Sequence, residues 1–254
     1  MRTDGPPPGQ ESHLPDATRQ QSGFAVIGDG PAAVLWDMDG TLLDSEKIWT
    51  VSLADTARWL GGELSQAARD DVVGSNMART LTIMFDDLGL EQDAGRKAET
   101  AAFLTIRTGE LFAEGLIWRP GAQEALGTVR DAGWPMALVT NTERALTEMA
   151  LDAIGRERFV VTVCGDEVPH GKPAPDPYLR AADLLGVDAE DCLAVEDSPT
   201  GTLAAARAGA SVLVVPCDVP VPTGPGRVHR ESLVGLSPSD VRGAHSLARA
   251  DRAA

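Results

Sequence analysis

Basic residues are scarce in this sequence: 22 Lys and Arg stand against 38 Asp and Glu, so the formal net charge is −16. Nucleic-acid phosphates are bound by basic surfaces, so this deficit argues against a nucleic-acid partner. Long apolar runs are also missing: none reaches the ~18 residues of a membrane-spanning helix. The opening MRTDGPPPGQESHLPD lacks the apolar segment of a signal peptide. We therefore expect a cytoplasmic protein that binds neither membrane nor nucleic acid.

Cysteine is scarce as well. The three cysteines, Cys164, Cys192 and Cys217, are odd in number and show no Cys-x-x-C spacing. We expect reduced and mostly buried thiols, as is usual in the cytoplasm.

Short apolar runs are present and predict the fold. The 254 residues are 43% apolar, enough for a substantial core. Runs without strict alternation are typical of strands buried on both faces, in a parallel sheet covered by helices. We therefore predict an α/β fold built on a Rossmann-like, doubly wound parallel sheet. The predicted strands are Ala33–Trp36, Met136–Thr140, Phe159–Cys164, Cys192–Val195 and Ser211–Val215.

Three helices are predicted between these strands, each with a polar start or an early Pro and a Gly at its end. The first is capped by Thr142 and ends before Gly155, the second runs from Asp176 to Gly186, and the third from Ser198 to Gly209.

A long segment without strands follows the first strand, from Ser45 to about Trp118, and its helical patterns predict an inserted cap domain. Its two connections to the sheet are expected to lie side by side and to act as a hinge. The predicted division is a disordered tail at 1–30, a core at 31–44 and 119–216, a helical cap at 45–118, and a C-terminal extension at 217–254 with one short helix.

Polar residues follow the predicted strands where each one ends. Ligands bind beyond the carboxyl ends of the strands in such a sheet, so these residues are candidates for one site. They are found in Asp37-Met38-Asp39, Thr140-Asn141-Thr142, Gly171-Lys172-Pro173 and Glu196-Asp197-Ser198.

Four carboxylates at one edge repel one another: two unit charges at about 4 Å cost roughly 4 kcal/mol at an effective dielectric of about 20. A hard cation would neutralise them, and oxygen ligands fit Mg²⁺. The absence of His and Cys from the cluster argues against zinc. Lys172 then supplies positive charge for an anionic substrate.

The same residues carry a family resemblance. Asp37-Met38-Asp39-Gly40-Thr41-Leu42 resembles the first motif, DxDGT, of the haloacid dehalogenase superfamily. Thr140-Asn141, Lys172 in GKPAPDPY, and Glu196-Asp197 in VEDSPTG are similar to the second, third and fourth motifs, in order. The helical insert resembles that of the capped subgroup that includes β-phosphoglucomutase-like enzymes.

The resemblance implies a small phosphorylated metabolite as substrate and a role for each residue. Asp37 is the implied nucleophile, which forms an aspartyl-phosphate, and Asp39 the general acid and then base. Thr140 by its hydroxyl and Asn141 by its backbone N–H hold the phosphoryl oxygens. Lys172 bridges nucleophile and phosphate. The implied Mg²⁺ ligands are the Asp37 carboxylate, the Asp39 backbone carbonyl, Asp197, and Glu196 directly or through water.

Hydrolysis and mutase chemistry both remain open. β-Phosphoglucomutases have a His where an ungapped alignment puts Trp49. They also have a phosphate-binding Arg three residues after a cap glycine, and aligning that glycine with Gly74 puts Met77 there. These differences favour a Mg²⁺-dependent phosphatase over a sugar-phosphate mutase. A non-catalytic regulator that binds a phosphorylated metabolite is the third possibility. We expect a monomer or a weak homodimer.

Overall fold

The computed structural model describes residues 30–217 and 219–253. The tail predicted to be disordered, residues 1–30, therefore lies outside the described residues except for its last position. Within the described ranges, no helix combines the length and the apolar character needed to cross a bilayer.

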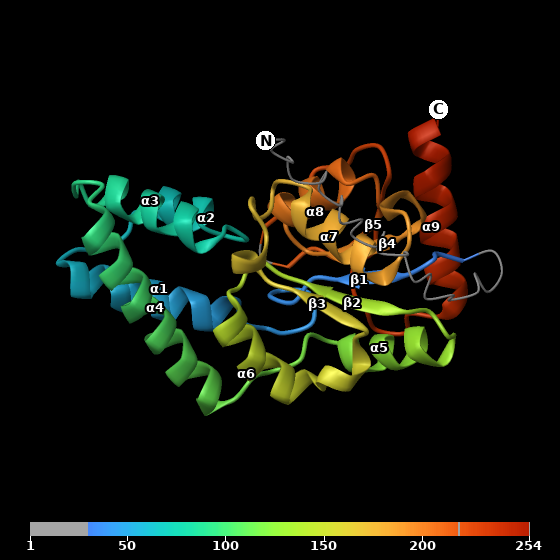
Figure 1. The fold of residues 1–254 in the computed structure, drawn as a ribbon, viewed down its shortest axis with the longest axis horizontal. Coiled ribbons are helices and arrows are strands. Elements are labelled where there is room, and N and C mark those ends of the chain that lie inside the picture. The colour runs from blue at the N-terminus through green and yellow to red at the C-terminus, as the bar shows by residue number, and fades with distance from the viewer. Residues whose placement is uncertain (1–29, 218, 254) are drawn as a thin grey trace, which may run out of the picture.

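Six strands form one sheet in the order β3-β2-β1-β4-β5-β6, and every neighbouring pair is parallel (Figure 1). This confirms the predicted doubly wound parallel sheet. Each of the five predicted strands is present, with bounds that differ by one or two residues. The strands are β1 (Val34–Trp36), β2 (Met136–Val139), β3 (Val161–Val163), β4 (Leu193–Glu196), β5 (Ser211–Val214) and β6 (Arg227–His229).

Helices cover both faces of the sheet, because the central strands are apolar on both sides. In β1, Val34 and Trp36 pack into one core cluster and Leu35 into the other. The first cluster includes residues of α5, α6 and α9, and the second includes residues of α7 and α8 (Figure 1). These helices are α5 (Ala122–Asp131), α6 (Arg144–Ile154), α7 (Asp176–Leu185), α8 (Pro199–Arg207) and α9 (Pro238–Ala253), with short 3₁₀ turns at Arg156–Arg158, Gly165–Glu167 and Ala189–Asp191.

The C-terminal region differs from the prediction in two ways. The sheet gains a sixth strand, β6, at its edge. The helix expected to be short has 16 residues and packs on β4, β5 and β6, with Val241, Ala244 and Ala248 buried. β6 escaped prediction because an edge strand needs no continuous apolar run, and none of its three residues is fully buried.

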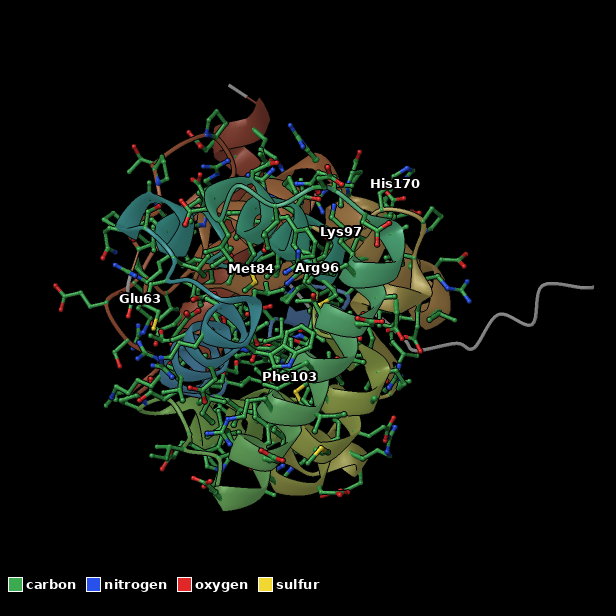
Figure 2. The ribbon with its side chains drawn as sticks, turned by 90° about the vertical axis from the view of Figure 1, so that its left-hand side faces the viewer. Glu63, Met84, Arg96, Lys97, Phe103 and His170 are labelled. Atoms are coloured by element: carbon green, nitrogen blue, oxygen red, sulfur yellow. The ribbon has the colours of Figure 1, made fainter. Side chains whose placement is uncertain are left out.

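Five helices lie between β1 and β2, and the first four of them form the cap (Figure 1). They enclose a small core of their own, in which Met84 and Phe85 are fully buried. Figure 2 looks onto this end of the molecule, with Phe103 near the centre of the view. The cap helices are α1 (Glu46–Leu60), α2 (Gln66–Asp71), α3 (Met77–Asp87) and α4 (Ala94–Glu114).

The two linkers between cap and core run side by side. The Asp44 N–H donates to the Ile117 carbonyl at 2.8 Å, and the Arg119 N–H donates to the Leu42 carbonyl at 2.8 Å. An isolated antiparallel bridge lies between these two hydrogen bonds. The predicted adjacency of the two connections is therefore present.

Candidate active site

The predicted site residues meet where the sheet changes winding direction. β1 lies between β2 and β4, and such a switch point is where ligands bind in open α/β sheets. Six of the seven predicted residues line one cavity of about 460 Å³ between sheet and cap. The seventh, Glu196, is fully buried at the end of β4. The six lining residues are Asp37, Asp39, Thr140, Asn141, Lys172 and Asp197.

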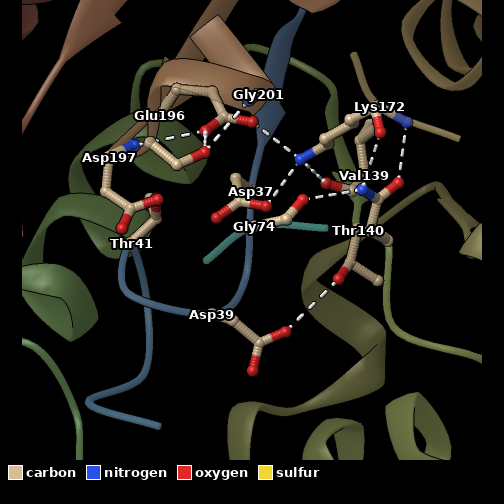
Figure 3. Close-up of polar contacts among 12 residues, drawn as sticks. Asp37, Asp39, Thr41, Gly74, Val139, Thr140, Lys172, Glu196, Asp197 and Gly201 are labelled. Atoms are coloured by element: carbon tan, nitrogen blue, oxygen red, sulfur yellow. Dashed lines mark hydrogen bonds and ion pairs between the residues drawn. The ribbon is translucent and has the colours of Figure 1, made fainter. Parts of the chain in front are cut away.

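The Lys172 ammonium lies at the centre of the polar contacts (Figure 3). It donates to Asp37 Oδ1 at 2.6 Å, to Glu196 Oε1 at 2.7 Å and to the Val139 carbonyl at 2.9 Å. These three acceptors use all three of its N–H groups. Burial alone would lower the pKa of Lys172, but the Asp37 and Glu196 carboxylates raise it above its ordinary value. Lys172 is thus a fixed, buried cation.

Both carboxylate oxygens of Glu196 accept hydrogen bonds. Oε1 accepts from Lys172 and from the Tyr178 hydroxyl at 2.5 Å. Oε2 accepts from the Asp197 backbone N–H at 3.2 Å and from the Ser198 hydroxyl at 3.3 Å. These four bonds fill the four acceptor positions of a carboxylate, so Glu196 is well placed to orient Lys172. Direct coordination of a metal by Glu196 stays a prediction.

Three buried carboxylates face this one ammonium. Asp37, Glu196 and Asp197 each place an oxygen within 4.8 Å of the others. Three negative charges and one positive charge leave −3 + 1 = −2 when all groups are ionised. Burial, and then the Glu196 charge, raise the pKa of Asp37 to about 7. Burial, and then the Asp37 charge, raise the pKa of Asp197 well above its ordinary value.

The excess negative charge fits a divalent cation. One such ion supplies the two missing positive charges, and the donors are all oxygens, which hard cations prefer. The cluster therefore indicates a divalent metal site.

The Asp39 carboxylate lies at the boundary between core and cap. Its Oδ1 accepts from the Ser45 hydroxyl at 2.6 Å and from the Trp49 indole N–H at 2.9 Å. Its Oδ2 accepts from the Thr142 hydroxyl at 2.7 Å and more weakly from the Thr140 hydroxyl at 3.4 Å. Two donors come from the start of the cap and two from the loop after β2, so the orientation of Asp39 depends on both parts.

The predicted capping role of Thr142 is wrong. Helix α6 begins at Arg144, and its N-cap is Glu143, which makes no side-chain cap hydrogen bond. The Thr142 hydroxyl instead donates to the Asp39 carboxylate. A charge-assisted hydrogen bond to a carboxylate is stronger than a neutral one, which explains the preference.

The Asn141 side chain connects the core to the cap. Its Nδ2 donates to the Gly74 carbonyl at 2.8 Å and to the Lys172 carbonyl at 3.1 Å, and its Oδ1 accepts from the Lys172 backbone N–H at 2.8 Å. Gly74 lies between α2 and α3 with φ +68°, in the left-handed region that glycine adopts readily. The predicted phosphate contact through the Asn141 backbone N–H stays a prediction.

The site contacts of Ser45, Trp49 and Tyr178 were also not predicted from the sequence. Ser45 and Trp49 were assigned to the cap without a role toward Asp39, because nothing in the sequence shows how the start of α1 lies against the segment after β1. Tyr178 does have a sequence signal, since it ends the GKPAPDPY segment that contains Lys172. Its hydroxyl is buried against Glu196, and burial raises the pKa of Tyr178 well above its usual range.

Comparison with known proteins agrees with this geometry. A family model described as haloacid dehalogenase-like hydrolase matches residues 31–209. Hexitol phosphatase A from Escherichia coli (strain K12) is 32% identical over 192 residues, covering 73% of this chain and 84% of that protein. Phosphoglycolate phosphatase from Xanthomonas campestris pv. campestris (strain 8004) is 34% identical over 182 residues, covering 70% of this chain and 80% of that protein.

Solved structures share the fold. CbbY from Rhodobacter sphaeroides, in complex with phosphate, matches with a TM-score of 0.74 and 26% identity, covering 83% of this chain and 99% of that chain. A mutant of the same protein was solved in complex with xylulose-(1,5)bisphosphate.

Fold and site together define a capped enzyme with a Rossmann-like α/β core, in which a helical insert covers a carboxylate-rich cavity at the sheet edge. The family match covers more than half of the described chain. This chain belongs to the haloacid dehalogenase-like hydrolase family, and it is a phosphatase-type member.

Proposed function

We propose that this phosphatase hydrolyses a small phosphomonoester with Mg²⁺ as its cation and Asp37 as its nucleophile. The observation that carries the proposal is the 2.6 Å contact of Lys172 with Asp37, inside a cluster with two further buried carboxylates. Asp37 is thereby held in a cavity that it shares with Asp39. A fixed nucleophile beside a second carboxylate supports two-step phosphoryl transfer.

The first step uses both carboxylates. Asp37 Oδ1 is held by Lys172, and its second oxygen lies on the side of Asp197 (Figure 3). An oxygen of ionised Asp37 attacks phosphorus, and the bond between phosphorus and the leaving oxygen breaks. Asp39 donates a proton to that leaving oxygen, so the product leaves as an alcohol.

The second step restores the enzyme. Asp39, now ionised, takes a proton from a water molecule, whose oxygen attacks the phosphorus of the aspartyl-phosphate. The bond between phosphorus and Asp37 breaks, and inorganic phosphate leaves. Throughout, the Thr140 hydroxyl and the Asn141 backbone N–H hold the phosphoryl oxygens.

The Asp37 and Asp197 carboxylates and the Asp39 backbone carbonyl would hold the metal, with Glu196 acting through water or through Lys172. When bound, the cation adds positive charge next to the phosphate and keeps Asp37 ionised. Lys172 keeps the attacking carboxylate in position.

Two observations favour a phosphatase over the alternatives. Trp49 and Met77 line the cavity where a mutase resemblance calls for His and Arg. Asp37, Asp39 and Lys172 are all retained and share the cavity, which favours an enzyme over a non-catalytic regulator. The monomeric or weakly dimeric state and the cytoplasmic location stay predictions.

The direct test is release of inorganic phosphate from para-nitrophenyl phosphate and a panel of sugar phosphates, with Mg²⁺ or with a chelator. We expect release only with Mg²⁺. Conversion of β-glucose 1-phosphate into glucose 6-phosphate without phosphate release would support the mutase instead.

The metal-free protein is expected to lose stability as pH rises. The unfolded chain releases the Asp37 proton near pH 3.9, whereas the folded chain keeps it up to about pH 7. Between these values the folded state binds the extra proton, so the free energy of unfolding falls as pH rises from about 4 to 7 and does not recover above that. A shift of this size corresponds to a few kcal/mol at most, at ~1.4 kcal/mol per unit. Urea unfolding of chelated protein at pH 5 and pH 8 measures it.

Asp37→Asn is the control for this pH effect, because it removes the titrating carboxyl and leaves all other acidic residues unchanged. We expect a smaller loss between pH 5 and pH 8 in this variant. Mg²⁺ at pH 8 is expected to stabilise the unmodified chain more than the variant, as ligand linkage requires. Equal pH slopes in the two proteins would contradict the assignment of a raised pKa to Asp37.

Trp49→Phe is expected to lower kcat about tenfold with little change in KM, because it removes one hydrogen bond that orients Asp39. The Phe ring keeps the edge contact with Phe112, whose centroid lies 6.4 Å from that of Trp49. Trp59→Phe is the matched control on the same helix, since Trp59 is 48% exposed and stacks on Phe103. An equal effect of both substitutions would contradict a positioning role for Trp49.

A further inference from the structure

The cap wall of the cavity is mostly apolar where it is buried. Besides Trp49 and Ala54, six apolar side chains line it, and four of them are less than 9% exposed. The one buried polar side chain of the cap that lines it is Thr80, whose hydroxyl is hydrogen-bonded to that of Ser75 at 2.5 Å. A polyol needs hydrogen-bonding partners for each hydroxyl it buries, and aliphatic side chains provide none. The six residues are Leu53, Leu64, Val72, Val73, Met77 and Leu104.

The cationic side chains of the cap that line this cavity are already engaged. Arg58 is paired with Asp55 and is 62% exposed. Arg69 donates to the Leu64 carbonyl and to Gln66 Oε1, and it too is exposed. Exposed lining residues lie at the rim, and Figure 2 shows Glu63, also a lining residue, directed away from the molecule. On the cap side, the rim is therefore charged, whereas the buried part of the wall carries no charged side chain.

Carboxylates flank the end of the cavity that holds Asp39. Glu46 and Glu143 both line it, and each directly follows a residue that donates to Asp39, namely Ser45 and Thr142. Burial, and then the Asp166 charge, raise the pKa of Glu143 above its ordinary value, so this carboxyl is already in a place unfavourable for negative charge. A second phosphate or a carboxylate on the substrate would meet like charge here.

We propose that the substrate is a monoester with a single phosphate, whose leaving group is largely apolar and carries no second anionic group. This inference rests on the proposed phosphatase function. The phosphate lies at Asp37 and Lys172, and the leaving group extends along the wall formed by Leu53, Met77 and Leu104. A cavity of about 460 Å³ is within the range for small-molecule sites, so the leaving group has room for a ring system.

A panel of four esters with Mg²⁺ tests the proposal, with phosphate release as the readout. 1-Naphthyl phosphate is the apolar probe, glucose 6-phosphate the polyol probe, and phosphoglycolate and fructose 1,6-bisphosphate carry a second anionic group. We expect kcat/KM for 1-naphthyl phosphate to exceed each of the others by about tenfold or more, the size of effect that apolar pocket contacts supply.

A pair of variants links that preference to the wall. Met77→Gln places an amide on the wall and is expected to lower kcat/KM for 1-naphthyl phosphate about tenfold, with a smaller loss for glucose 6-phosphate, because the amide can hydrogen-bond to a sugar hydroxyl. Met149→Gln is the matched control, because Met149 is 37% exposed on α6 and does not line the cavity.

The outcomes distinguish failure of this substrate class from failure of the proposed phosphatase function. Phosphate release that is faster from glucose 6-phosphate or from a doubly anionic ester overturns the apolar substrate class and leaves the phosphatase intact. Equal losses on both monoesters in the Met77 variant also overturn it. No release from any ester overturns the proposed function itself.

Discussion

Asp37→Asn is expected to reduce phosphate release by about four orders of magnitude or more, because an amide cannot take the place of the attacking carboxylate. Its shape is preserved, and its carbonyl oxygen can still accept from Lys172, so the site is expected to keep its arrangement. Steady-state release from para-nitrophenyl phosphate with Mg²⁺ measures the loss. Asp131→Asn, an exposed residue of α5 paired with Arg130, is the matched control and is expected to retain full activity.

A variant that is inactive because it unfolds would be less stable than the unmodified chain, and we expect the opposite for Asp37→Asn. Asp37→Asn removes one of three buried carboxylates that face a single ammonium. The metal-free variant is therefore expected to be at least as stable as the unmodified chain at pH 8. Turnover within tenfold of the unmodified enzyme would exclude Asp37 as the nucleophile.

Lys172→Met is expected to lower the free energy of unfolding at pH 8 by about 3–5 kcal/mol, because it leaves buried carboxylates without their cation. Activity is expected to disappear as well, since Asp37 loses the group that holds it. The destabilisation is expected to be smaller at pH 5, where the raised pKa of Asp37 lets that carboxyl take up a proton. Urea unfolding at pH 8 and pH 5 measures the destabilisation and its pH dependence.

A charge-matched control and a second substitution sharpen the Lys172 prediction. Lys47→Met removes a lysine that is 84% exposed, and its effect is expected to be below about 0.5 kcal/mol. Adding Glu196→Gln to Lys172→Met removes one uncompensated charge and is expected to recover part of the lost stability. A Lys172→Met protein as stable as the unmodified chain at pH 8 would contradict the electrostatic account of the cluster.

The sheet and most of the site could be predicted because their signals are local. Each of β1 to β5 is a short apolar run, and polar groups stand directly after β1, β2 and β4. Parallel strands place these ends at one edge, so convergence of Asp37, Thr140 and Asp197 follows from topology alone. Lys172 lies nine residues after the end of β3, so its place in the site was inferred from the GKPAPDPY segment and not from a strand end.

The remaining features depend on tertiary contacts that no short segment encodes. β6 lies at the sheet edge with Val228 as its one partly buried hydrophobic residue, so its pairing with β5 decides its structure. The Trp49 indole reaches Asp39 because the first turn of α1 lies beside the segment that follows β1. Thr142 precedes a helix, as a capping residue would, but its hydroxyl donates to the nearby Asp39 carboxylate instead.

The paired linkers allow the cap to change in sequence and length while the sheet stays the same. The chain leaves the core and returns to it through neighbouring backbone segments joined at Asp44 and Arg119, so the gap between exit and re-entry is fixed whatever lies between them. An insert of another length or another helix count would meet the same two anchor points. New leaving-group pockets can therefore arise by exchanging this insert, provided that its start keeps hydrogen-bond donors for Asp39 where Ser45 and Trp49 now lie.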